Sequence, residues 1–485
     1  MAILEAAYTV GRAGPGPEPF AGRTVSEALR AERKPPLDGA QAMAESMRCL
    51  LCGGPYAAAP CVTACPAGVD VPAMIDAIGR GERERAARIV LEENPLGGTC
   101  ARVCPTEVLC EGACVLVHDG QPAVDIAGLE RFAMDSLGPE GGGTILPPVL
   151  GRGRAGDGAS GGGGAGRATV SVIGAGPAGL TCASVLAERG FAVTVYDDRA
   201  EAGGLVRYAV APYRQLDEPL PAERRRIEEL GVRFVPVAGA EALGVLAEAD
   251  RADAVFLGVG MGDDRRLGLE GEDLQGVFTS LPFIAALKSG RPPAVGARVV
   301  VVGGGNTAMD VAREAVRLGA HEVTVLYRRT EVEMPAYHHE YLEARADGVN
   351  FLWLTTPVRL VGKAGRLVGV ECRYMRLGEV DASGRRRAEA VPGTEFQLAV
   401  DTLVEAIGQE PRRAFLAGIP GLEVADGRIV VDPASGQTGN PRYFAGGDAV
   451  NGGDTVVAAV RGAKVAAAGI ERFLSEARRP LGPHA

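Results

Sequence analysis

Eight of the ten cysteines in this sequence lie in two short runs. The first run, "CLLCGGPYAAAPCVTACP", contains Cys49, Cys52, Cys61 and Cys65. The second run, "CARVCPTEVLCEGAC", contains Cys100, Cys104, Cys110 and Cys114. Thiols grouped in this way could pair as disulfides, bind zinc or hold iron–sulfur clusters. The three cases describe very different proteins: a secreted scaffold, a zinc protein or an electron carrier.

The rest of the sequence helps to choose among disulfides, zinc and iron–sulfur clusters. The N-terminal stretch "MAILEAAYTVGRAGPGPEPF" lacks the charged and apolar regions of a secretory signal, and no run of about 18 apolar residues occurs. We therefore expect a cytoplasmic protein with no membrane span, in which clustered cysteines bind metal more often than they form disulfides. The net charge of −10, with no basic stripe, argues against nucleic-acid binding. Cys182 and Cys372 form no Cys-x-x-Cys pair, which argues against a redox dithiol.

Zinc and iron–sulfur both remain open on the cysteines alone, because eight thiols could fill two zinc sites. The Cys-Pro steps at Cys65 and Cys104 favour iron–sulfur. In ferredoxin-type runs with two clusters, the cysteine before proline ligates the other cluster rather than that of its neighbours.

Helices are expected to carry the cysteines. "DGAQAMAESMRC" leads into the first run, residues 71–94 between the runs have helical spacing of apolar side chains, and "VDIAGLERFAMDSL" follows the second run. Residues 151–167 are mostly glycine, contain no apolar residue larger than alanine, and are expected to form a flexible linker.

Beyond the linker, two segments each predict a strand, a glycine-rich turn, a helix and a second strand. In the first, Gly174, Gly176 and Gly179 form G-x-G-x-x-G, and the next strand ends at Asp197. The glycines allow a tight turn and close approach of a pyrophosphate, while the acid accepts hydrogen bonds from a ribose. This segment predicts a dinucleotide site, the alternative being a tight structural turn.

The second segment has Gly303, Gly305 and Ala308 in its turn, and its following strand ends in "YRR" with no acid. Arg328 and Arg329 could bind a 2′-phosphate, so this site should prefer NADP(H), unless both arginines are simply solvated. A third turn, near the C-terminus, places Asp448 after Gly446 and Gly447.

Several motifs in the same order resemble the glutamate synthase small subunit and the N-terminal half of dihydropyrimidine dehydrogenase. They are "RCLLC", "CVTACP", "NPLGGTCARVCPTEVLCEGAC", "VIGAGPAGL", "VVVVGGGNTAMD", "YRRTEVEMPA" and "FAGGDAV". The resemblance implies an α/β protein of flavin disulfide-reductase type: an N-terminal helical iron–sulfur domain, then an FAD domain interrupted by an NADP domain. It implies three kinds of cofactor: FAD, NADP(H) and two 4Fe-4S clusters.

The resemblance also implies site residues. One cluster would be held by Cys49, Cys52, Cys61 and Cys114. The other would be held by Cys65, Cys104, Cys110 and Glu130, which leaves Cys100 to pack as a small apolar residue. The segment "GGPYAAAP" makes the step from Cys52 to Cys61 longer than the family pattern and looks like an insertion. The residues expected at the dinucleotide sites are Gly174, Gly176, Gly179, Asp197, Gly204, Gly447, Asp448, Gly303, Gly305, Asn306, Arg328 and Arg329.

The expected domains follow from these motifs. They are an extended arm (1–40), a helical cluster domain (41–137), a linker (138–168), an FAD domain in two parts (169–292 and 401–485) and an NADP(H) domain (293–400). No acid–base residue is required, so no catalytic residue is assigned; Glu333 either lies near the nicotinamide or is a surface carboxylate.

The expected function is electron input. NADPH gives up a hydride, each cluster accepts one electron, and FAD can do both, so the electrons would pass through FAD and the clusters to a partner. That partner would be a catalytic subunit like the glutamate synthase large subunit or like dihydropyrimidine dehydrogenase. The alternatives are a stand-alone NADPH:ferredoxin oxidoreductase and a non-catalytic assembly subunit.

Overall fold

The computed structural model describes residues 23–137, 167–237, 248–381 and 384–477, together with Phe20 and Leu246. The expected linker lies almost entirely outside the described residues, as does about half of the expected arm. Where the arm is described, it contains the helix α2 (Val25–Leu29) rather than extended chain alone. Thr24 begins this helix, because its N–H donates to the Glu27 carboxylate at 2.7 Å and its hydroxyl accepts from the Glu27 N–H.

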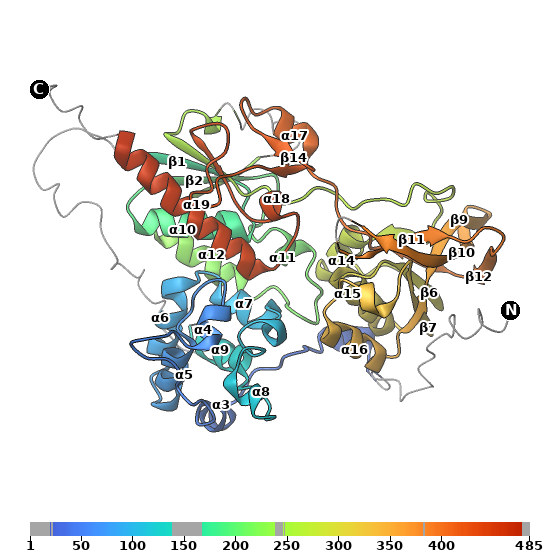
Figure 1. The fold of residues 1–485 in the computed structure, drawn as a ribbon, viewed down its shortest axis with the longest axis horizontal. Helices are drawn as coiled ribbons and strands as arrows, with labels where there is room; N and C mark the ends of the chain where they lie inside the picture. The colour runs from blue at the N-terminus through green and yellow to red at the C-terminus, as the bar shows by residue number, and fades with distance from the viewer. Residues whose placement is uncertain are drawn as a thin grey trace, which may run out of the picture. The chain divides into compact units, whose positions relative to one another are not determined.

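The chain divides into two compact units, shown in Figure 1. The larger unit comprises Lys34–Arg207, Asp217–Met261 and Pro411–Ala485. The smaller unit comprises Met1–Arg33, Tyr208–Leu216 and Gly262–Glu410. Each unit contains one parallel sheet, and the larger unit also contains the cysteine-rich helical domain. Among the helices that the structure describes, none has the length and apolar content needed to cross a membrane.

The helical domain carries all eight clustered cysteines on short helices and the loops between them. The helices are α3 (Gly39–Ser46), α4 (Pro60–Ala64), α5 (Val71–Gly79), α6 (Arg83–Glu93), α7 (Gly97–Val103), η1 (Thr106–Val108), α8 (Val115–His118) and α9 (Ile126–Asp135). The helix predicted before the first cysteine is α3, and the one predicted after the last is α9. Residues 71–94 form two helices, because Gly81 adopts a φ of 76° and turns the chain between them.

The first sheet has five parallel strands in the order β16–β4–β1–β2–β3. The strands are β1 (Thr169–Ile173), β2 (Ala192–Asp197), β3 (Arg233–Pro236), β4 (Ala254–Leu257) and β16 (Tyr443–Ala445). The helices of this part are α10 (Pro177–Glu188), α11 (Leu205–Tyr208), α12 (Leu220–Glu229), α17 (Arg413–Ala417), α18 (Asp448–Asn451) and α19 (Val456–Ala477). A small hairpin pairs β14 (Val424–Ala425) with β15 (Arg428–Ile429).

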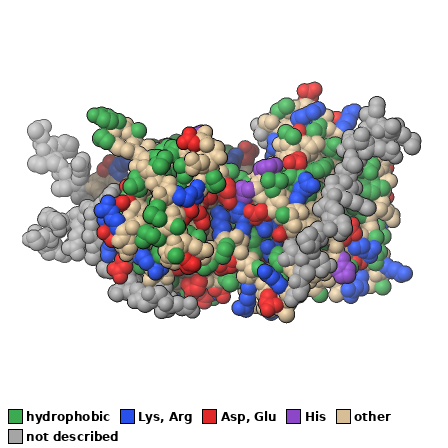
Figure 2. Space-filling model, turned by 90° about the horizontal axis from the view of Figure 1, so that it is seen from below, with side chains coloured by type: hydrophobic (Ala, Val, Ile, Leu, Met, Phe, Trp, Pro, Cys, Tyr) green, Lys and Arg blue, Asp and Glu red, His purple; other side chains and the backbone are tan. Residues whose placement is uncertain are grey.

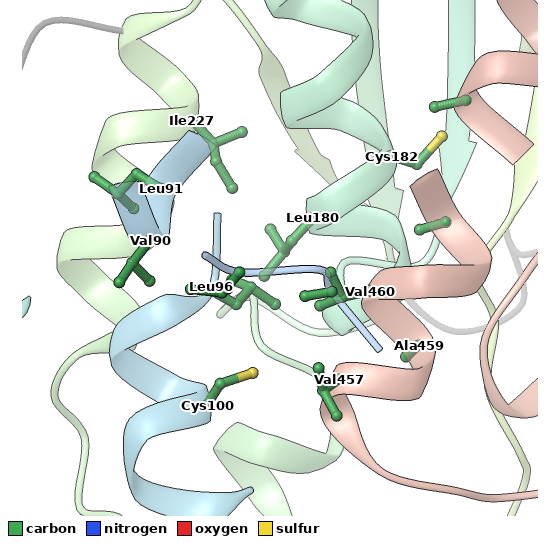
Figure 3. Close-up of a cluster of buried hydrophobic side chains, with 14 of the residues drawn as sticks. Val90, Leu91, Leu96, Cys100, Leu180, Cys182, Ile227, Val457, Ala459 and Val460 are labelled. Atoms are coloured by element: carbon green, nitrogen blue, oxygen red, sulfur yellow. The ribbon is translucent and has the colours of Figure 1, made fainter. Parts of the chain in front are cut away.

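The helical domain and the first sheet share one hydrophobic core (Figure 3). The helical domain contributes Val90, Leu91, Leu96 and Cys100, and the helices beside the sheet contribute Leu180, Ile227, Val457 and Val460. Leu96 and Leu180 are among the largest fully buried side chains. Burying apolar surface is the main stabilising term in such contacts, so packing as well as chain connection holds the helical domain against this sheet.

The second sheet, in the smaller unit, has the order β5–β13–β6–β7–β8 and is also parallel. Its strands are β5 (Val277–Thr279), β6 (Arg298–Val302), β7 (Glu322–Tyr327), β8 (Asn350–Trp353) and β13 (Thr402–Glu405). Its helices are α14 (Ser280–Lys288), α15 (Asn306–Arg317), η3 (Glu331–Glu333) and α16 (His338–Ala346). An antiparallel layer is formed by β9 (Thr355–Lys363), β10 (Arg366–Val380), β11 (Arg386–Ala390) and β12 (Phe396–Ala399).

The borders of the smaller unit differ from those expected at 293 and 400. Strand β5 precedes residue 293 and β13 follows residue 400, yet both lie in the second sheet. The continuous part of the unit therefore runs from Gly262 to Glu410. Neither strand carries a glycine-rich motif, and β13 pairs with β6 across about a hundred residues, so local sequence does not reveal their sheet.

Candidate functional site

Four cysteines from separate segments line one cavity of the helical domain. Cys49 and Cys52 follow α3, Cys61 lies in the first turn of α4, and Cys114 directly precedes α8. All other described side chains that line this cavity are apolar, so the four thiols are the only polar side chains that the described part of the chain contributes to it. These are the four residues that the sequence assigns to one cluster.

A second cavity brings together the four residues assigned to the other cluster. Cys65, Cys104, Cys110 and Glu130 all line it. Cys100, which the sequence analysis assigned to packing, lines it as well and is 3% exposed. The second cavity therefore offers five candidate ligands for a site that needs four.

The two cavities are neighbours, because Val71 and Ile126 line both of them. Val457, at the start of α19, lines only the second cavity. Leu50, whose side chain is 63% exposed, lines only the first. The second cavity therefore adjoins a helix of the first sheet, and the first cavity lies closer to solvent.

Burial raises the pKa of acidic groups around both cavities. In the first, it raises the pKa of Cys61 to about 11. In the second, it raises the pKa of Cys104 well above its usual value, and burial with the nearby carboxylates of Glu223 and Glu111 raises the pKa of Glu130 to about 8. These groups keep their protons at neutral pH unless a cation lies beside them, and bound iron reverses this preference because it takes thiolate as its ligand.

The spacing of the cysteines bears on the choice between zinc and iron–sulfur. Among the residues that the structure describes, no three His, Cys, Asp or Glu side chains lie close enough to share a single metal ion. A zinc site needs its ligands roughly 2.0–2.3 Å from one centre. The thiols surround the two cavities, and a cluster of iron and sulfide takes its thiolate ligands from around it in this way.

Buried and partly buried polar contacts join the helical domain to the helices of the first sheet. Thr99 of α7 donates its N–H and its hydroxyl to the Glu223 carboxylate of α12, at 2.9 and 2.6 Å. Lys464 of α19 donates to the backbone carbonyls of Ala67 and Glu93, at 2.8 and 2.9 Å. Hydrogen bonds that involve a charged group are the stronger kind. They tie the cysteine-bearing segments to the helices of the first sheet.

The first glycine-rich turn joins β1 to α10. Gly174 has a φ of +102°, and a Cβ on Gly179 would lie 1.8 Å from the Gly174 carbonyl oxygen. Gly176 differs, because a Cβ there would meet only the Cα of Gly204, at 3.8 Å. The fold thus requires glycine at two of the three positions and leaves the third open, as expected where a pyrophosphate approaches the backbone.

Two partly buried carboxylates lie near this turn. Asp197, at the end of β2, accepts hydrogen bonds from the N–H groups of Ala175 and Arg199 at 2.5 and 2.9 Å. Asp448, at the start of α18, accepts from the Asp454 N–H at 3.2 Å, and burial raises the pKa of Asp448 to about 6. The parallel strands β1, β2 and β16 end at one edge of the sheet, so both carboxylates and the turn share that edge.

The two remaining residues predicted for the first site also pack against the turn. A Cβ on Gly204 would lie 2.8 Å from the Cα of Gly176, and one on Gly447 would lie 2.9 Å from the Ala178 side chain. All residues predicted for the first dinucleotide site are therefore gathered around one loop.

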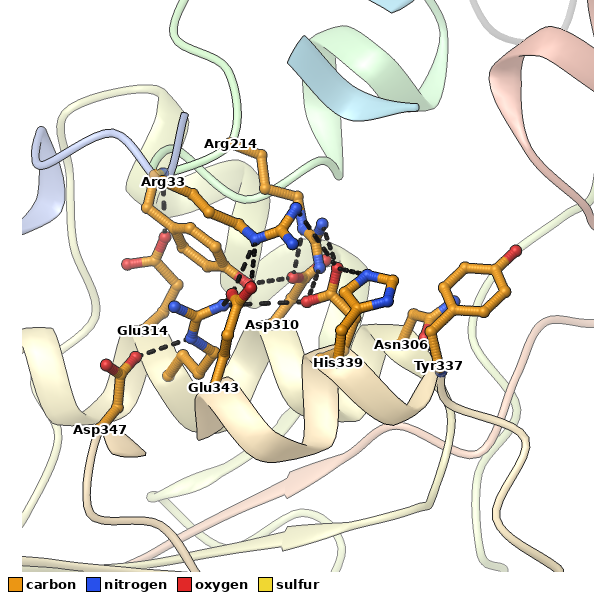
Figure 4. Close-up of polar contacts among 12 residues, drawn as sticks. Arg33, Arg214, Asn306, Asp310, Glu314, Tyr337, His339, Glu343 and Asp347 are labelled. Atoms are coloured by element: carbon orange, nitrogen blue, oxygen red, sulfur yellow. Dashed lines mark hydrogen bonds and ion pairs between the residues drawn. The ribbon is translucent and has the colours of Figure 1, made fainter. Parts of the chain in front are cut away.

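The second glycine-rich turn, between β6 and α15, has a similar construction. A Cβ on Gly303 would lie 2.2 Å from the Ala406 carbonyl oxygen, whereas one on Gly305 would meet no atom within 4 Å. Asn306 begins α15, and its side-chain oxygen accepts a hydrogen bond from the Tyr337 N–H at 2.9 Å (Figure 4). The backbone at Gly305 is again open to a ligand.

The two arginines after β7 lie in different environments. Arg329 is 4% exposed and donates to the Arg386 carbonyl at 2.6 Å and the Asp381 carboxylate at 2.8 Å. Arg328 is exposed. Of the two, Arg328 is the side chain that an incoming phosphate can reach.

Glu333, which the sequence analysis considered as a neighbour of the nicotinamide, has a local structural role. Its carboxylate accepts hydrogen bonds from the Thr330 hydroxyl at 2.5 Å and the Thr330 N–H at 3.2 Å. It thereby caps the short helix η3.

A buried ion network that the sequence analysis missed supports the second turn (Figure 4). Arg214 donates to Asp310 of α15 and to Glu340 of α16, both at 2.7 Å, and the Tyr213 hydroxyl donates to Asp310 at 2.5 Å. The network joins the two helices that lie behind the turn. Tyr213 and Asp310 are 97 residues apart, so no local pattern could have revealed the contact.

Glu405 makes the folding stability of this unit depend on pH. It is fully buried at the end of β13, and burial together with the nearby Glu272 raises its pKa from 4.5 to about 7. Because its pKa is raised, the stability it contributes is complete below pH 4.5 and is lost as the pH rises through 7. We expect Glu405→Gln to raise Tm by roughly 5 °C at pH 8 and to change it little at pH 4.

Thermal unfolding of both proteins at the two pH values measures this effect. Glu423→Gln, which removes an exposed carboxylate of the same type, is the control and should change Tm little at either pH. Equal shifts of Tm at pH 4 and pH 8 for Glu405→Gln would contradict the prediction.

Two known protein families match this chain, one over the glycine-rich turns and one over the clustered cysteines. Residues 168–463 match the family described as pyridine nucleotide-disulphide oxidoreductase, a range that holds all three glycine-rich turns. Residues 27–141 match dihydropyrimidine dehydrogenase domain II, 4Fe-4S cluster, a range that holds the eight clustered cysteines and Glu130.

Curated relatives cover most of the chain. The small chain of NADPH glutamate synthase from Escherichia coli K12 is 37% identical over 458 residues, which are 90% of this chain and 93% of the relative. Subunit beta of the NADP(+)-dependent formate dehydrogenase from Moorella thermoacetica is 40% identical over 438 residues, 87% of this chain but 61% of the relative. Subunit beta of the NADPH-Fe(3+) oxidoreductase from Geobacter sulfurreducens is 37% identical over 87% of this chain and 65% of its own length. The chain thus spans less than two thirds of the last two relatives.

Among solved structures, FprA from Mycobacterium tuberculosis, determined in complex with NADPH, is similar in fold. It superposes with a TM-score of 0.53 at 22% identity and covers 64% of this chain and 86% of its own. The similarity shows that the two chains share a fold over 64% of this chain.

Proposed function

Because this chain belongs to the pyridine nucleotide-disulphide oxidoreductase family and carries a 4Fe-4S domain, we propose that it is an electron-input subunit that oxidises NADPH for a partner. Its cofactors are FAD, NADP(H) and 4Fe-4S clusters. The observation that carries the proposal is the position of the two cysteine-lined cavities. They adjoin each other, with the second next to a helix of the first sheet and the first next to solvent.

Each domain has its own cofactor in this proposal. In the proposal, the first sheet and its helices bind FAD, the second sheet with residues 262–410 binds NADP(H), and residues 34–137 hold the clusters. FAD, when bound, would accept a hydride from NADPH and release its two electrons singly. An iron–sulfur cluster accepts electrons one at a time. The protein positions these groups and excludes water, so no acid–base side chain is needed.

Around FAD, the backbone at Gly176 and the start of α10 would face the pyrophosphate, where the helix dipole favours negative charge. Asp197 would accept hydrogen bonds from the ribose. Asp448 would hold the ribityl chain, and its raised pKa fits a carboxyl that hydrogen-bonds to hydroxyl groups rather than to a cation.

Around the clusters, we assign Cys49, Cys52, Cys61 and Cys114 to the first cavity. We assign Cys65, Cys104, Cys110 and Glu130 to the second. The fit rests on four candidate donors in the first cavity and five in the second, and on otherwise mainly apolar walls. Partly buried thiols with raised pKa values lose their protons only beside a strong cation, which the iron of a bound cluster would supply.

Arg328 should select NADPH over NADH. Arg328→Ala removes the exposed guanidinium that faces the proposed 2′-phosphate, and one charged hydrogen-bonding pair contributes about 1.5–3 kcal/mol. We therefore expect kcat/KM for NADPH to fall by roughly tenfold to a hundredfold, with little change for NADH. Steady-state kinetics with both nucleotides and an artificial acceptor measure this.

Arg376→Ala, which removes an exposed arginine on β10, is the control and should leave both values unchanged. Equal losses of kcat/KM for NADPH and NADH in Arg328→Ala would show that the side chain does not bind the 2′-phosphate. Arg329→Ala is expected to lower stability instead, because it breaks the buried pair with Asp381.

The proposed partner is a catalytic subunit of the glutamate synthase type. The relatives that this chain covers almost completely, at 93% and 97% of their length, are both named small chains of glutamate synthase. A partner like dihydropyrimidine dehydrogenase or a ferredoxin would keep the same input chemistry with a different acceptor.

The proposal is tested with the isolated chain, purified without oxygen. Addition of NADPH should bleach the flavin absorbance and produce the electron paramagnetic resonance signals of reduced 4Fe-4S clusters. Failure of NADPH to reduce the flavin would favour a non-catalytic assembly subunit. Fast turnover with ferredoxin, without any other subunit, would favour a stand-alone oxidoreductase.

A further inference from the structure

Four large apolar side chains are exposed between residues 47 and 56, a segment that also contains two cysteines of the first cavity. The exposed fractions are 73% for Met47, 63% for Leu50, 49% for Leu51 and 99% for Tyr56. We call these four residues the apolar patch. Single exposed apolar side chains are common, but a group of them on one surface marks an interaction site. Figure 2 shows hydrophobic side chains gathered on the part of the surface formed by the helical domain, on its left.

The patch belongs to an ordered segment. Gly54 and Ala57 form an antiparallel bridge, and the Gly54 N–H donates to the Ala57 carbonyl at 3.0 Å. Pro55 and Tyr56 lie at the tip of this tight turn. The turn is the segment "GGPYAAAP" that lengthens the step from Cys52 to Cys61. The insertion therefore presents one aromatic ring, almost fully exposed, next to two cysteines of the first cavity.

The segment that carries three of the four patch residues is uncharged. The sequence has no Asp, Glu, Lys, Arg or His from residue 49 to residue 69. The nearest cation, Arg48, is paired with Glu45 at 2.5 Å and donates to the Ala123 carbonyl at 3.0 Å. A charged carrier that binds transiently is usually steered by opposite charges, and the segment from residue 49 to residue 69 offers none. An apolar face is typical of a lasting contact between subunits.

We propose that the apolar patch is the surface on which the partner subunit docks, and that the partner meets it with an apolar, uncharged face. The inference rests on the proposed function, and it names where electrons leave the chain and what kind of surface receives them. Leu50 lies both in the wall of the first cavity and on the patch, so a partner seated there approaches the first cluster across a single layer of side chains. Related proteins are themselves named subunits or small chains.

The first experiment locates the contact without measuring activity. The chain is tagged in its native cells, and the subunit that copurifies in stoichiometric amount is identified and then produced separately. A photo-crosslinking phenylalanine analogue then replaces Tyr56 in one variant and Val424, an apolar residue of β14 that is 38% exposed, in a control. The analogue at position 56 should crosslink to that subunit and the one at position 424 should not.

The second experiment tests the chemistry of the partner surface. Tyr56→Glu and Tyr56→Lys should both weaken binding to the separately produced subunit by roughly tenfold or more, because either charge must be buried against an apolar face. Tyr56→Phe should bind like the original chain. Val424→Glu, the matched control, should also bind normally.

Every outcome of these two experiments either supports or overturns the proposed docking surface. Weakening by glutamate with strengthening by lysine, or the reverse, would reveal a charged partner surface and overturn it. Absence of a stoichiometric subunit, crosslinking of one copy of the chain to another, or equal crosslinking from both positions would overturn it as well. The proposed function is tested separately, because NADPH should still reduce the flavin and the clusters of every patch variant when it is isolated.

Discussion

Cys104→Ser should remove about half of the iron and sulfide from protein purified without oxygen. Cys104 lines only the second cavity, and three of the four donors proposed for the first cavity lie in other segments, so the first cluster should remain. Serine in a buried site offers a weaker ligand than thiolate, which should abolish the second cluster rather than merely change its potential. Iron and sulfide assays together with the spectrum of the reduced protein measure the loss.

Transfer of electrons should fail in this variant although NADPH still reduces the flavin. The second cavity adjoins α19 of the first sheet, so its cluster would be the first acceptor after FAD. Flavin bleaching should therefore continue, while reduction of the remaining cluster becomes slow. Normal reduction of that cluster would show that the second cavity is not on the route.

Cys100→Ala is the matched control for Cys104→Ser. Both thiols line the same cavity and both have raised pKa values caused mainly by burial. Cys100 should be dispensable for iron binding if Glu130 supplies the fourth ligand. Half the iron in Cys100→Ala as well would make Cys100 a ligand beside Cys65, Cys104 and Cys110, and Glu130 would then lose its proposed role.

Gly176→Ala should strongly reduce FAD binding and leave the fold intact. A Cβ at this position meets only the Gly204 Cα, at 3.8 Å, which is ordinary contact. It would, however, stand where the pyrophosphate approaches the backbone. Loss of one or two charged hydrogen bonds, each of about 1.5–3 kcal/mol, would weaken FAD binding by at least roughly tenfold.

The measurement is the FAD content of the purified variant, with Tm of the flavin-free protein as the test of the fold. Gly179→Ala is the contrasting variant, because its Cβ would lie 1.8 Å from the Gly174 carbonyl oxygen. That change should lower both Tm and FAD content. Normal FAD binding in Gly176→Ala would mean that this turn is structural only.

The sequence predicted the fold class, the glycine-rich turns and the cysteine-bearing helices correctly, because each depends on residues close together in the chain. A strand, a turn and a helix within about thirty residues have a recognisable apolar period. The two cysteine runs likewise carry their own spacing and their Cys-Pro steps. The family resemblance then implied two sets of four ligands, and the structure brings each set to one cavity.

Features that depend on distant segments were not visible in the sequence. Strand β13 joins the second sheet through pairing with β6, and Tyr213 reaches Asp310 across 97 residues. Arg328 and Arg329 are adjacent in the sequence and identical in type. Only Arg329 is buried, where it pairs with Asp381, whereas Arg328 is exposed. Position relative to solvent is likewise a property of the packed chain. The sequence shows "GGPYAAAP" only as an insertion between Cys52 and Cys61, whereas the structure places its tyrosine at the surface. Spacing along the chain identifies the groups that can do chemistry, whereas burial and long-range pairing determine which of them meet and which face a partner.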